Sequence, residues 1–169
     1  MSRVATFAFA FAFLVPALPA AAQTASPVPA GEEAVDPYTV SNANAGAQPF
    51  AGTEMLAAFH GREGIGRIVD DLVDHVQTDD RLSEIFKASD FVRLRRTLKE
   101  QVCYILNGGC EYTGRDMKKV HEDHGIVTAE FGALVELLQD AMNREGIAFG
   151  AQNRLLAKLA PMKRDTVTR

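Results

Sequence analysis

The stretch from Ile65 to Val76, IGRIVDDLVDHV, decides the fold class of this 169-residue chain. Its apolar residues recur at intervals of three and four, which is the spacing of one face of an α-helix. Aspartates occupy the opposite side, so the segment predicts an amphipathic helix with one buried face. The apolar face comprises Ile65, Ile68, Val69, Leu72, Val73 and Val76.

Three later segments carry the same periodicity and predict three more helices. Asn107-Gly108-Gly109 ends the first of them, because Asn and Gly accept the left-handed conformation that closes a helix. Alternating apolar and polar runs with turn dipeptides, the pattern of strands, do not occur, so the fold class is all-α. The three stripes are Phe91, Leu94, Leu98, Val102 and Ile105; Phe131, Leu134, Val135, Leu138, Ala141 and Met142; and Leu155, Leu156, Leu159 and Met162.

The N-terminus predicts export. A basic start at Arg3 precedes an apolar run over 4–15, a proline at 16 and small residues at Ala20–Ala22. This pattern is typical of a secretory signal peptide, residues 1–22, and the run is too short for a membrane anchor. We therefore expect a periplasmic or secreted protein that has no membrane contact after cleavage.

The rest of the chain divides into two parts. Residues 23–52 are rich in Ala, Pro and Gly and poor in periodic apolar residues, so they predict a flexible leader. Residues 53–169 carry the helical stripes and form the predicted domain. The net charge of −4, from 18 basic and 22 acidic residues, gives no basic footprint for nucleic acid.

Two cysteines, Cys103 and Cys110, flank a short segment that contains the Gly pair. Export exposes them to an oxidising compartment, and the glycines allow the chain to fold back, so we predict a disulfide. A zinc site formed with His121 and His124 is the alternative. Its C-x6-C and H-x2-H spacings match no common zinc module, so the disulfide is favoured.

Residues 107–118 contain three glycines and no helical stripe. A loop of this length exceeds what a simple helix–helix connection needs, which favours a functional role. A very short helix follows, around Met117–His124, and Gly125 ends it. A short polar helix that carries histidine positions a side chain rather than building a core.

The segment Tyr112–Ile126, YTGRDMKKVHEDHGI, resembles the Y-T-G-x-x-M-x-x-x-H-x-x-x-G-I signature of group I truncated haemoglobins. The segment 79–86 is similar to the residues before that family's haem-facing Phe, and 59–65 is similar to its opening motif. The resemblance covers about 54–167. It implies a two-over-two helical sandwich around haem b, with one globin helix replaced by the Gly-rich loop.

The resemblance also implies roles for single residues. His121 matches the proximal iron ligand, and a neutral imidazole is the usual globin ligand. His124 departs from the family pattern; it is either a solvated side chain or a second ligand. The C-x-x-C-H motif is absent, so haem is expected to be held non-covalently. Positions that match the wall of the haem pocket are Phe86, Leu94, Leu98, Val102, Tyr112, Met117, Val120, Ile126 and Val135.

The opposite, distal side departs most from the family. Many members carry Tyr and Gln there to hold dioxygen by hydrogen bonds, and the matching positions are Val73 and Leu98. Thr97 and Gln101 are the nearest polar residues. An apolar distal pocket cannot donate a hydrogen bond to a gas ligand, which predicts weak dioxygen binding and fast oxidation. Four basic residues face either the haem propionates or solvent: Arg95, Arg96, Lys99 and Lys118.

The sequence thus predicts a haem-b-binding truncated globin that takes dioxygen, nitric oxide or carbon monoxide at the iron. A redox or electron-transfer haem protein with an unknown electron donor is the first alternative. It includes weak peroxidase or nitric oxide dioxygenase activity, so the sequence leaves open whether the protein is an enzyme. A haem-free helical interaction module is the second alternative.

Overall fold

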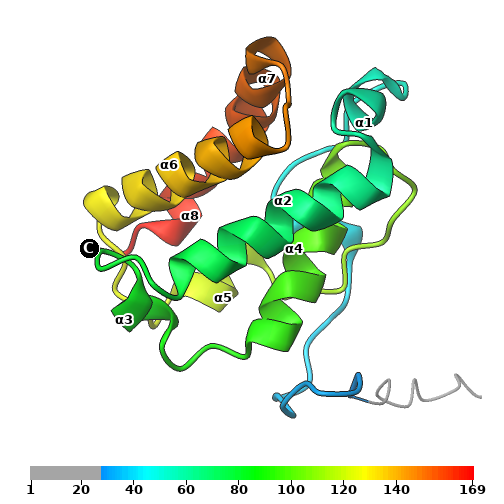
Figure 1. Ribbon diagram of the computed structural model, residues 1–169. Helices are drawn as coiled ribbons and strands as arrows, with labels where there is room; N and C mark the ends of the chain where they lie inside the picture. The colour runs from blue at the N-terminus through cyan, green and yellow to red at the C-terminus, as the bar shows by residue number, and fades with distance from the viewer. Residues whose placement is uncertain (1–27) are drawn as a thin grey trace, which may run out of the picture.

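The computed structural model describes residues 28–169, and the predicted signal peptide, residues 1–22, lies outside the described residues. Within 28–169 the chain forms only helices and loops (Figure 1), so the all-α prediction is confirmed. In the same range no helix is long and apolar enough to cross a membrane.

The helices follow the predicted stripes closely. The α-helices are α1 (Glu54–Ala58), α2 (Gly61–Val76), α3 (Ser83–Phe86), α4 (Phe91–Ile105), α5 (Met117–His121), α6 (Thr128–Arg144), α7 (Phe149–Leu159) and α8 (Lys163–Thr166). Two 3-10 helices, η1 (Asn42–Ala45) and η2 (Ala160–Met162), complete the set. The left-handed backbone of Asn107, with φ of 59°, lies just after α4, where the sequence predicted a helix stop.

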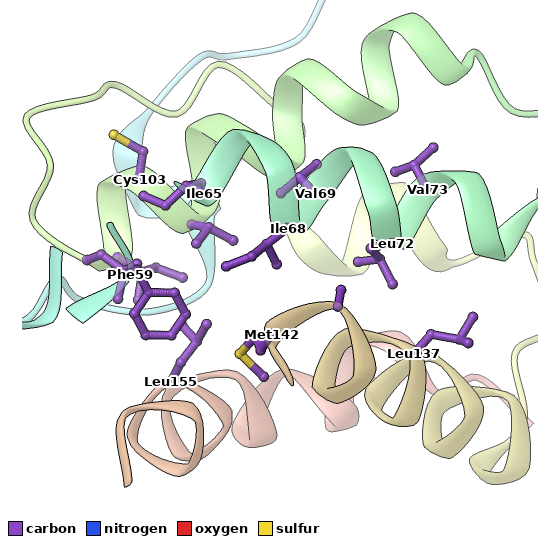
Figure 2. Packing of buried hydrophobic residues seen from close by; sticks show 14 of the residues in the cluster. Phe59, Ile65, Ile68, Val69, Leu72, Val73, Cys103, Leu137, Met142 and Leu155 are labelled. Atoms are coloured by element: carbon purple, nitrogen blue, oxygen red, sulfur yellow. The ribbon is translucent and has the colours of Figure 1, made fainter. Parts of the chain in front are cut away.

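Helix α2 lies in the middle of the fold and packs against α4 on one side and α6 on the other. Figure 2 shows how its apolar face divides. Val69 and Val73 point toward α4, while Ile68 and Leu72 point toward α6. All four are at most 5% exposed, and burying each such side chain contributes about 1.5–3 kcal/mol. The apolar stripe of α2 therefore packs against both α4 and α6.

Residues 28–52 differ from the prediction of a flexible leader. They run along α4 and the loop before α5, and Ala45 is fully buried in the core. The Glu32 carboxylate is 1% exposed and pairs with the guanidinium groups of Arg93 and Arg96. The prediction counted only apolar burial and did not anticipate these contacts. The segment is held by ion pairs and by hydrogen bonds to backbone groups, which hydropathy does not reveal.

Glu145, which follows α6, joins α6 to the beginning of α2. Its carboxylate accepts hydrogen bonds from Arg67 (2.7 and 3.0 Å) and pairs with His60 Nδ1 at 2.9 Å. The hydrogen bonds from Arg67 and then from His60 lower the pKa of Glu145 to about 2. The folded state thus favours the ionised carboxylate.

We expect Glu145→Gln to lower the free energy of unfolding by about 1 kcal/mol at pH 7. The pKa of Glu145 is lower in the folded protein than in the unfolded one, so its stabilisation is complete above about pH 4.5. It is lost as the pH falls toward 2. Urea unfolding between pH 3 and 7 measures this slope. The control is Glu84→Gln, which removes an exposed pair with Lys87, and such exposed pairs contribute little to stability. Equal effects of the two variants contradict the prediction.

Candidate haem site

His121, at the end of α5, lies on the wall of a cavity formed by five helices and their connections. Helices α3, α4, α6 and α8 supply the other walls. The last helix reaches the cavity because the chain turns back there, and Thr168 N–H donates to the carbonyl of Ile126 at 2.9 Å. The lining residues are Leu82, Ile85, Phe86, Ser89, Leu94, Val120, His121, His124, Ile126, Glu130, Phe131, Leu134 and Thr166.

The imidazole of His121 is oriented by its own helix. Its Nδ1 lies 2.6 Å from the carbonyl oxygen of Met117. Because a carbonyl only accepts hydrogen bonds, Nδ1 carries the proton and Nε2 carries the lone pair. Burial lowers the pKa of His121, against the hydrogen bond to Met117, which raises it; the nearby His124 lowers it further. The structure thus favours a neutral imidazole with Nε2 ready to act as a ligand.

These features fit haem. Apart from its two histidines, Ser89, Glu130 and Thr166, the cavity is lined by aliphatic and aromatic side chains, which suit a porphyrin face. One neutral imidazole whose second nitrogen donates to a backbone carbonyl is the arrangement that fixes the tautomer of a metal-binding histidine. His121 is the residue that would hold the iron.

The structure brings together part of the predicted pocket wall. Phe86, Leu94, Val120 and Ile126 line the cavity of His121. The other five predicted wall residues lie outside it: Leu98, Val102, Tyr112, Met117 and Val135. Tyr112 and Met117 are buried instead between α4 and residues 42–46. The Tyr112 hydroxyl donates to the carbonyl of Arg115 at 3.1 Å. Burial raises the pKa of Tyr112, so its hydroxyl stays protonated.

Several lining residues were missed by the sequence analysis. Phe131 and Leu134 belong to the predicted stripe of α6, so their side of the helix could have been assigned from periodicity. Leu82, Ile85 and Ser89 come from α3 and its flanks, which have no long stripe. Thr166 could not be found at all, because the return of the C-terminus is a tertiary feature.

The four predicted distal residues Val73, Thr97, Leu98 and Gln101 do not line the cavity. Val73 is 1% exposed and packs in the core between α2 and α4. The Thr97 hydroxyl donates to the carbonyl of Arg93 at 3.0 Å, within its own helix. The Gln101 amide donates to the carbonyl of Ala45 at 2.9 Å, so it binds the chain that precedes α1. The polar groups expected near a gas ligand are thus used elsewhere, and Leu94 is the cavity residue from α4.

Of the four basic residues for which the sequence left haem propionates or solvent open, the three on α4 form ion pairs within the protein. Arg95 pairs with Asp70 and Asp74, and Lys99 pairs with Asp70 at 2.7 Å, which ties α4 to α2. Arg96 pairs with Glu32 and Glu100. These cations border a separate hollow on the outer side of α4. The fourth, Lys118, is exposed on α5 and does not line the cavity of His121.

His124 also lines the cavity but is exposed, three residues beyond His121. Its backbone N–H donates to the carbonyl of His121 at 3.2 Å, where α5 gives way to the turn before α6. The geometry places the two imidazoles at one cavity, and only that of His121 is half-buried and hydrogen-bonded to the backbone.

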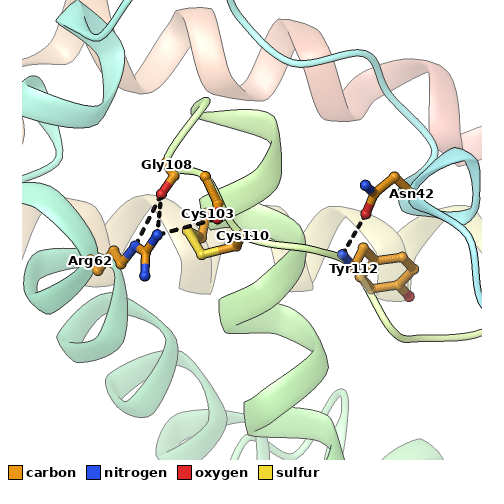
Figure 3. The surroundings of a disulfide bond; sticks show 7 residues. Asn42, Arg62, Cys103, Gly108, Cys110 and Tyr112 are labelled. Atoms are coloured by element: carbon orange, nitrogen blue, oxygen red, sulfur yellow. Dashed lines mark hydrogen bonds between the residues drawn. A yellow bond between two sulfur atoms is a disulfide. The ribbon is translucent and has the colours of Figure 1, made fainter.

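A disulfide joins Cys103, in the last turn of α4, to Cys110, with 5.7 Å between their Cα atoms (Figure 3). Arg62 of α2 reaches the same bend, where its guanidinium donates to the carbonyl of Gly108 at 2.7 and 3.0 Å. The bridge and Arg62 fix the beginning of the loop that leads to α5. Zinc ligation by these two cysteines is therefore not compatible with the structure.

Comparisons with known proteins agree with this fold and site. The family model described as bacterial-like globin matches residues 56–168. A group 1 truncated haemoglobin GlbN of Mycolicibacterium paratuberculosis is 30% identical over 108 residues, which are 64% of this chain and 79% of that protein. The protein of the same name from Nostoc commune is 28% identical over 103 residues, covering 61% of this chain and 87% of the relative.

Solved structures show the same fold. The truncated haemoglobin of Tetrahymena pyriformis in its Fe(III) form superposes with a TM-score of 0.65 at 18% identity, covering 68% of this chain and 98% of that chain. The 2/2 haemoglobin from Synechococcus sp. PCC 7002, in the cyanomet state with covalently attached haem, gives a TM-score of 0.62 at the same identity and coverage. At this identity the likeness concerns the fold alone, and it confirms the two-over-two sandwich.

The helical sandwich and its histidine-bearing cavity define a small haem protein of globin type. The chain belongs to the bacterial-like globin family, among the group 1 truncated haemoglobins. It is therefore a globin that binds haem and gaseous ligands. Membership of a haem protein family favours this function over the haem-free interaction module.

We expect the double variant Cys103→Ser/Cys110→Ser to lose about 2.5 kcal/mol of unfolding free energy, because the bridge closes a short loop in the unfolded chain. Urea unfolding of the two proteins measures the loss. A chemical reductant lowers the stability of the unaltered protein by the same amount and has no effect on the double variant. A reductant effect on the variant would contradict the assignment.

Proposed function

We propose that this protein is an exported truncated globin in which His121 is the iron ligand of haem b and a diatomic gas occupies the opposite face. One observation carries the assignment. The hydrogen bond from Nδ1 of His121 to the carbonyl of Met117, inside an apolar cavity, leaves Nε2 as a neutral donor atom. His124 shares the cavity and is exposed, so we assign it no ligand role.

Bound haem would supply an iron atom that His121 would hold and that would take a gas such as dioxygen, nitric oxide or carbon monoxide. The chain supplies the surroundings of that iron. His121 orients its imidazole through Met117, Phe86 contributes a flat aromatic surface, and aliphatic residues of α4 and α6 exclude water. These roles are binding roles, and none of them requires a proton to move.

The side of the cavity formed by α4 is apolar, and this favours a second candidate function. Leu94 lines the cavity, and the amide of Gln101 is held by Ala45. Without a hydrogen-bond donor from α4, a dioxygen ligand is bound less tightly and oxidation of the iron is less hindered. A redox role, in electron transfer or in weak peroxidase or nitric oxide dioxygenase chemistry with an electron donor still to be identified, suits that property.

Export is the remaining part of the proposal. Residues 1–22 carry the charge, apolar run and small residues of a signal peptide. The disulfide between Cys103 and Cys110 suits an oxidising compartment, since cytosolic thiols are kept reduced. Both observations support a periplasmic or secreted protein.

Replacing His121 with Ala is expected to abolish stable haem retention, because the cavity then lacks its half-buried imidazole. The matched change His124→Ala removes an exposed imidazole from the same cavity and is expected to leave retention unchanged. Absorbance of the haem Soret band after gel filtration measures both. Equal loss in the two variants would refute the assignment of a single ligand.

The apolar wall of α4 predicts that the reduced protein returns to its ferric spectrum within minutes in air-saturated buffer. Leu94→Gln adds an amide donor to the cavity and is expected to slow this oxidation roughly fivefold, the effect of about 1 kcal/mol from one hydrogen bond. Leu94→Met keeps the size without a donor and serves as the control. If Leu94→Gln and Leu94→Met oxidise at the same rate, the proposed cause is wrong.

A further inference from the structure

Residues 36–46, here called the N-terminal segment, precede the part of the chain that matches the globin family model. In the structure this segment contains η1 and lies beside the loop that leads into α5, residues 112–117, here called the proximal loop. The two segments are about 70 residues apart in the sequence. Their contact is therefore a tertiary feature that the globin core by itself does not supply.

The N-terminal segment binds the backbone of the proximal loop at three consecutive residues. Backbone groups of a loop have no partners within a helix, so side chains from elsewhere have to satisfy them. The three hydrogen bonds run from Tyr112 N–H to Asn42 Oδ1 (2.7 Å), from the Tyr38 hydroxyl to the Thr113 carbonyl (2.8 Å) and from Asn44 Nδ2 to the Gly114 carbonyl (3.2 Å). Figure 3 shows the first of them.

A fourth loop residue is held through its side chain. The guanidinium of Arg115 lies over the ring of Tyr38, 5.3 Å from its centroid. It also donates to the carbonyl of Asp36 at 3.3 Å. A cation over an aromatic face adds about 0.5–1 kcal/mol at an exposed site. The proximal loop is thus attached to the N-terminal segment from Tyr112 to Arg115.

The contact continues into α5 through Met117. Gly46 has a left-handed backbone with φ of 80°, and a Cβ atom there would lie 2.8 Å from Met117 Cγ. Beside it, Gln101 Nε2 donates to the carbonyl of Ala45 at 2.9 Å and lies 3.3 Å from Met117 Sδ. Met117 is the residue whose carbonyl accepts the hydrogen bond from His121. One close-packed path therefore joins the N-terminal segment to the imidazole.

Helix α5 needs such support because it has only five residues. A helix of this length is far below the size at which helical hydrogen bonds are stable by themselves. Asp116 caps it, with its carboxylate accepting from the backbone of Lys118 at 3.0 Å. A cap fixes where the helix begins but not how the helix is turned relative to the cavity.

We propose that the N-terminal segment is a positioning element for the iron ligand. It holds the proximal loop and Met117, and through them it sets the orientation of the His121 imidazole in the cavity. This proposal rests on the assignment of His121 as the haem ligand. It gives residues outside the globin core a role in how tightly haem is held, and Tyr38 and Asn42 are its positioning residues.

The test is the double variant Tyr38→Phe/Asn42→Ala in the full chain, which removes two of the three hydrogen bonds and keeps the Tyr38 ring. Three measurements report on it: hydrogen exchange of the amides of 112–121 in haem-free protein, haem transfer to excess apomyoglobin, and the iron–histidine stretching band in resonance Raman spectra of the reduced protein. We expect roughly tenfold faster exchange and haem loss. We also expect the band to shift or broaden.

Two matched variants separate positioning from general destabilisation. Asn42→Asp keeps an oxygen acceptor for the Tyr112 N–H, so when combined with Tyr38→Phe it is expected to bring exchange and haem loss back to the level of Tyr38→Phe alone. Thr39→Ala changes an exposed side chain and keeps the backbone carbonyl that accepts from Asn44 Nδ2. This variant is expected to match the unaltered protein. If the double variant does not fold, Tyr38→Phe by itself, which removes one hydroxyl, is compared in the same way.

Two results would overturn the proposal. One is exchange of 112–121 that is unchanged in the double variant. The other is faster exchange with haem loss and the Raman band both unchanged, which makes the segment structural only. His121→Ala, measured in parallel, distinguishes failure of the ligand assignment from failure of the proposal about the N-terminal segment. If that variant keeps the iron–histidine band, His121 is not the ligand, while exchange in haem-free protein still reports on the segment.

Discussion

Burial of the apolar stripe of α2 is the constraint on which the rest of the structure depends. The stripe is broad, and Gly64 extends it at the beginning of the helix, so one neighbouring helix cannot cover it. Helix α4 covers the side of Val69 and Val73, and α6 covers the side of Ile68 and Leu72. The cavity of His121 is lined by residues of both covering helices, Leu94 of α4 and Phe131 and Leu134 of α6.

Ion pairs between the helices reinforce this arrangement, and the residues that form them do not line the cavity of His121. The polar side of α2 carries Asp70 and Asp74, which pair with Arg95 and Lys99 of α4. At the other end of the α2–α6 contact, Glu145 pairs with Arg67. Exposed pairs contribute little individually, but they fix which side of α4 faces α2. The apolar side of α4, with Leu94, is thereby left for the cavity.

The position of His121 is controlled from outside its own helix. The proximal loop is fixed at its beginning by the disulfide and Arg62, and along its length by the N-terminal segment. A long loop with several glycines has many conformations, so its order has to come from external partners. The segment before α1 thus supplies hydrogen-bond partners that the proximal loop does not find within the globin core.

The sequence by itself determined the helices of the fold, because a period of 3.6 residues is a local property that each segment carries alone. It also predicted His121 as the candidate iron ligand, since the residues around that histidine form one continuous motif. The tertiary structure decided the rest. It decided that Gln101 turns toward Ala45 and not toward the cavity, because the partner of a side chain depends on which distant backbone comes within hydrogen-bond distance. For the same reason it decided how residues 28–52 dock, since many of their contacts are polar and long-range, and hydropathy does not reveal them.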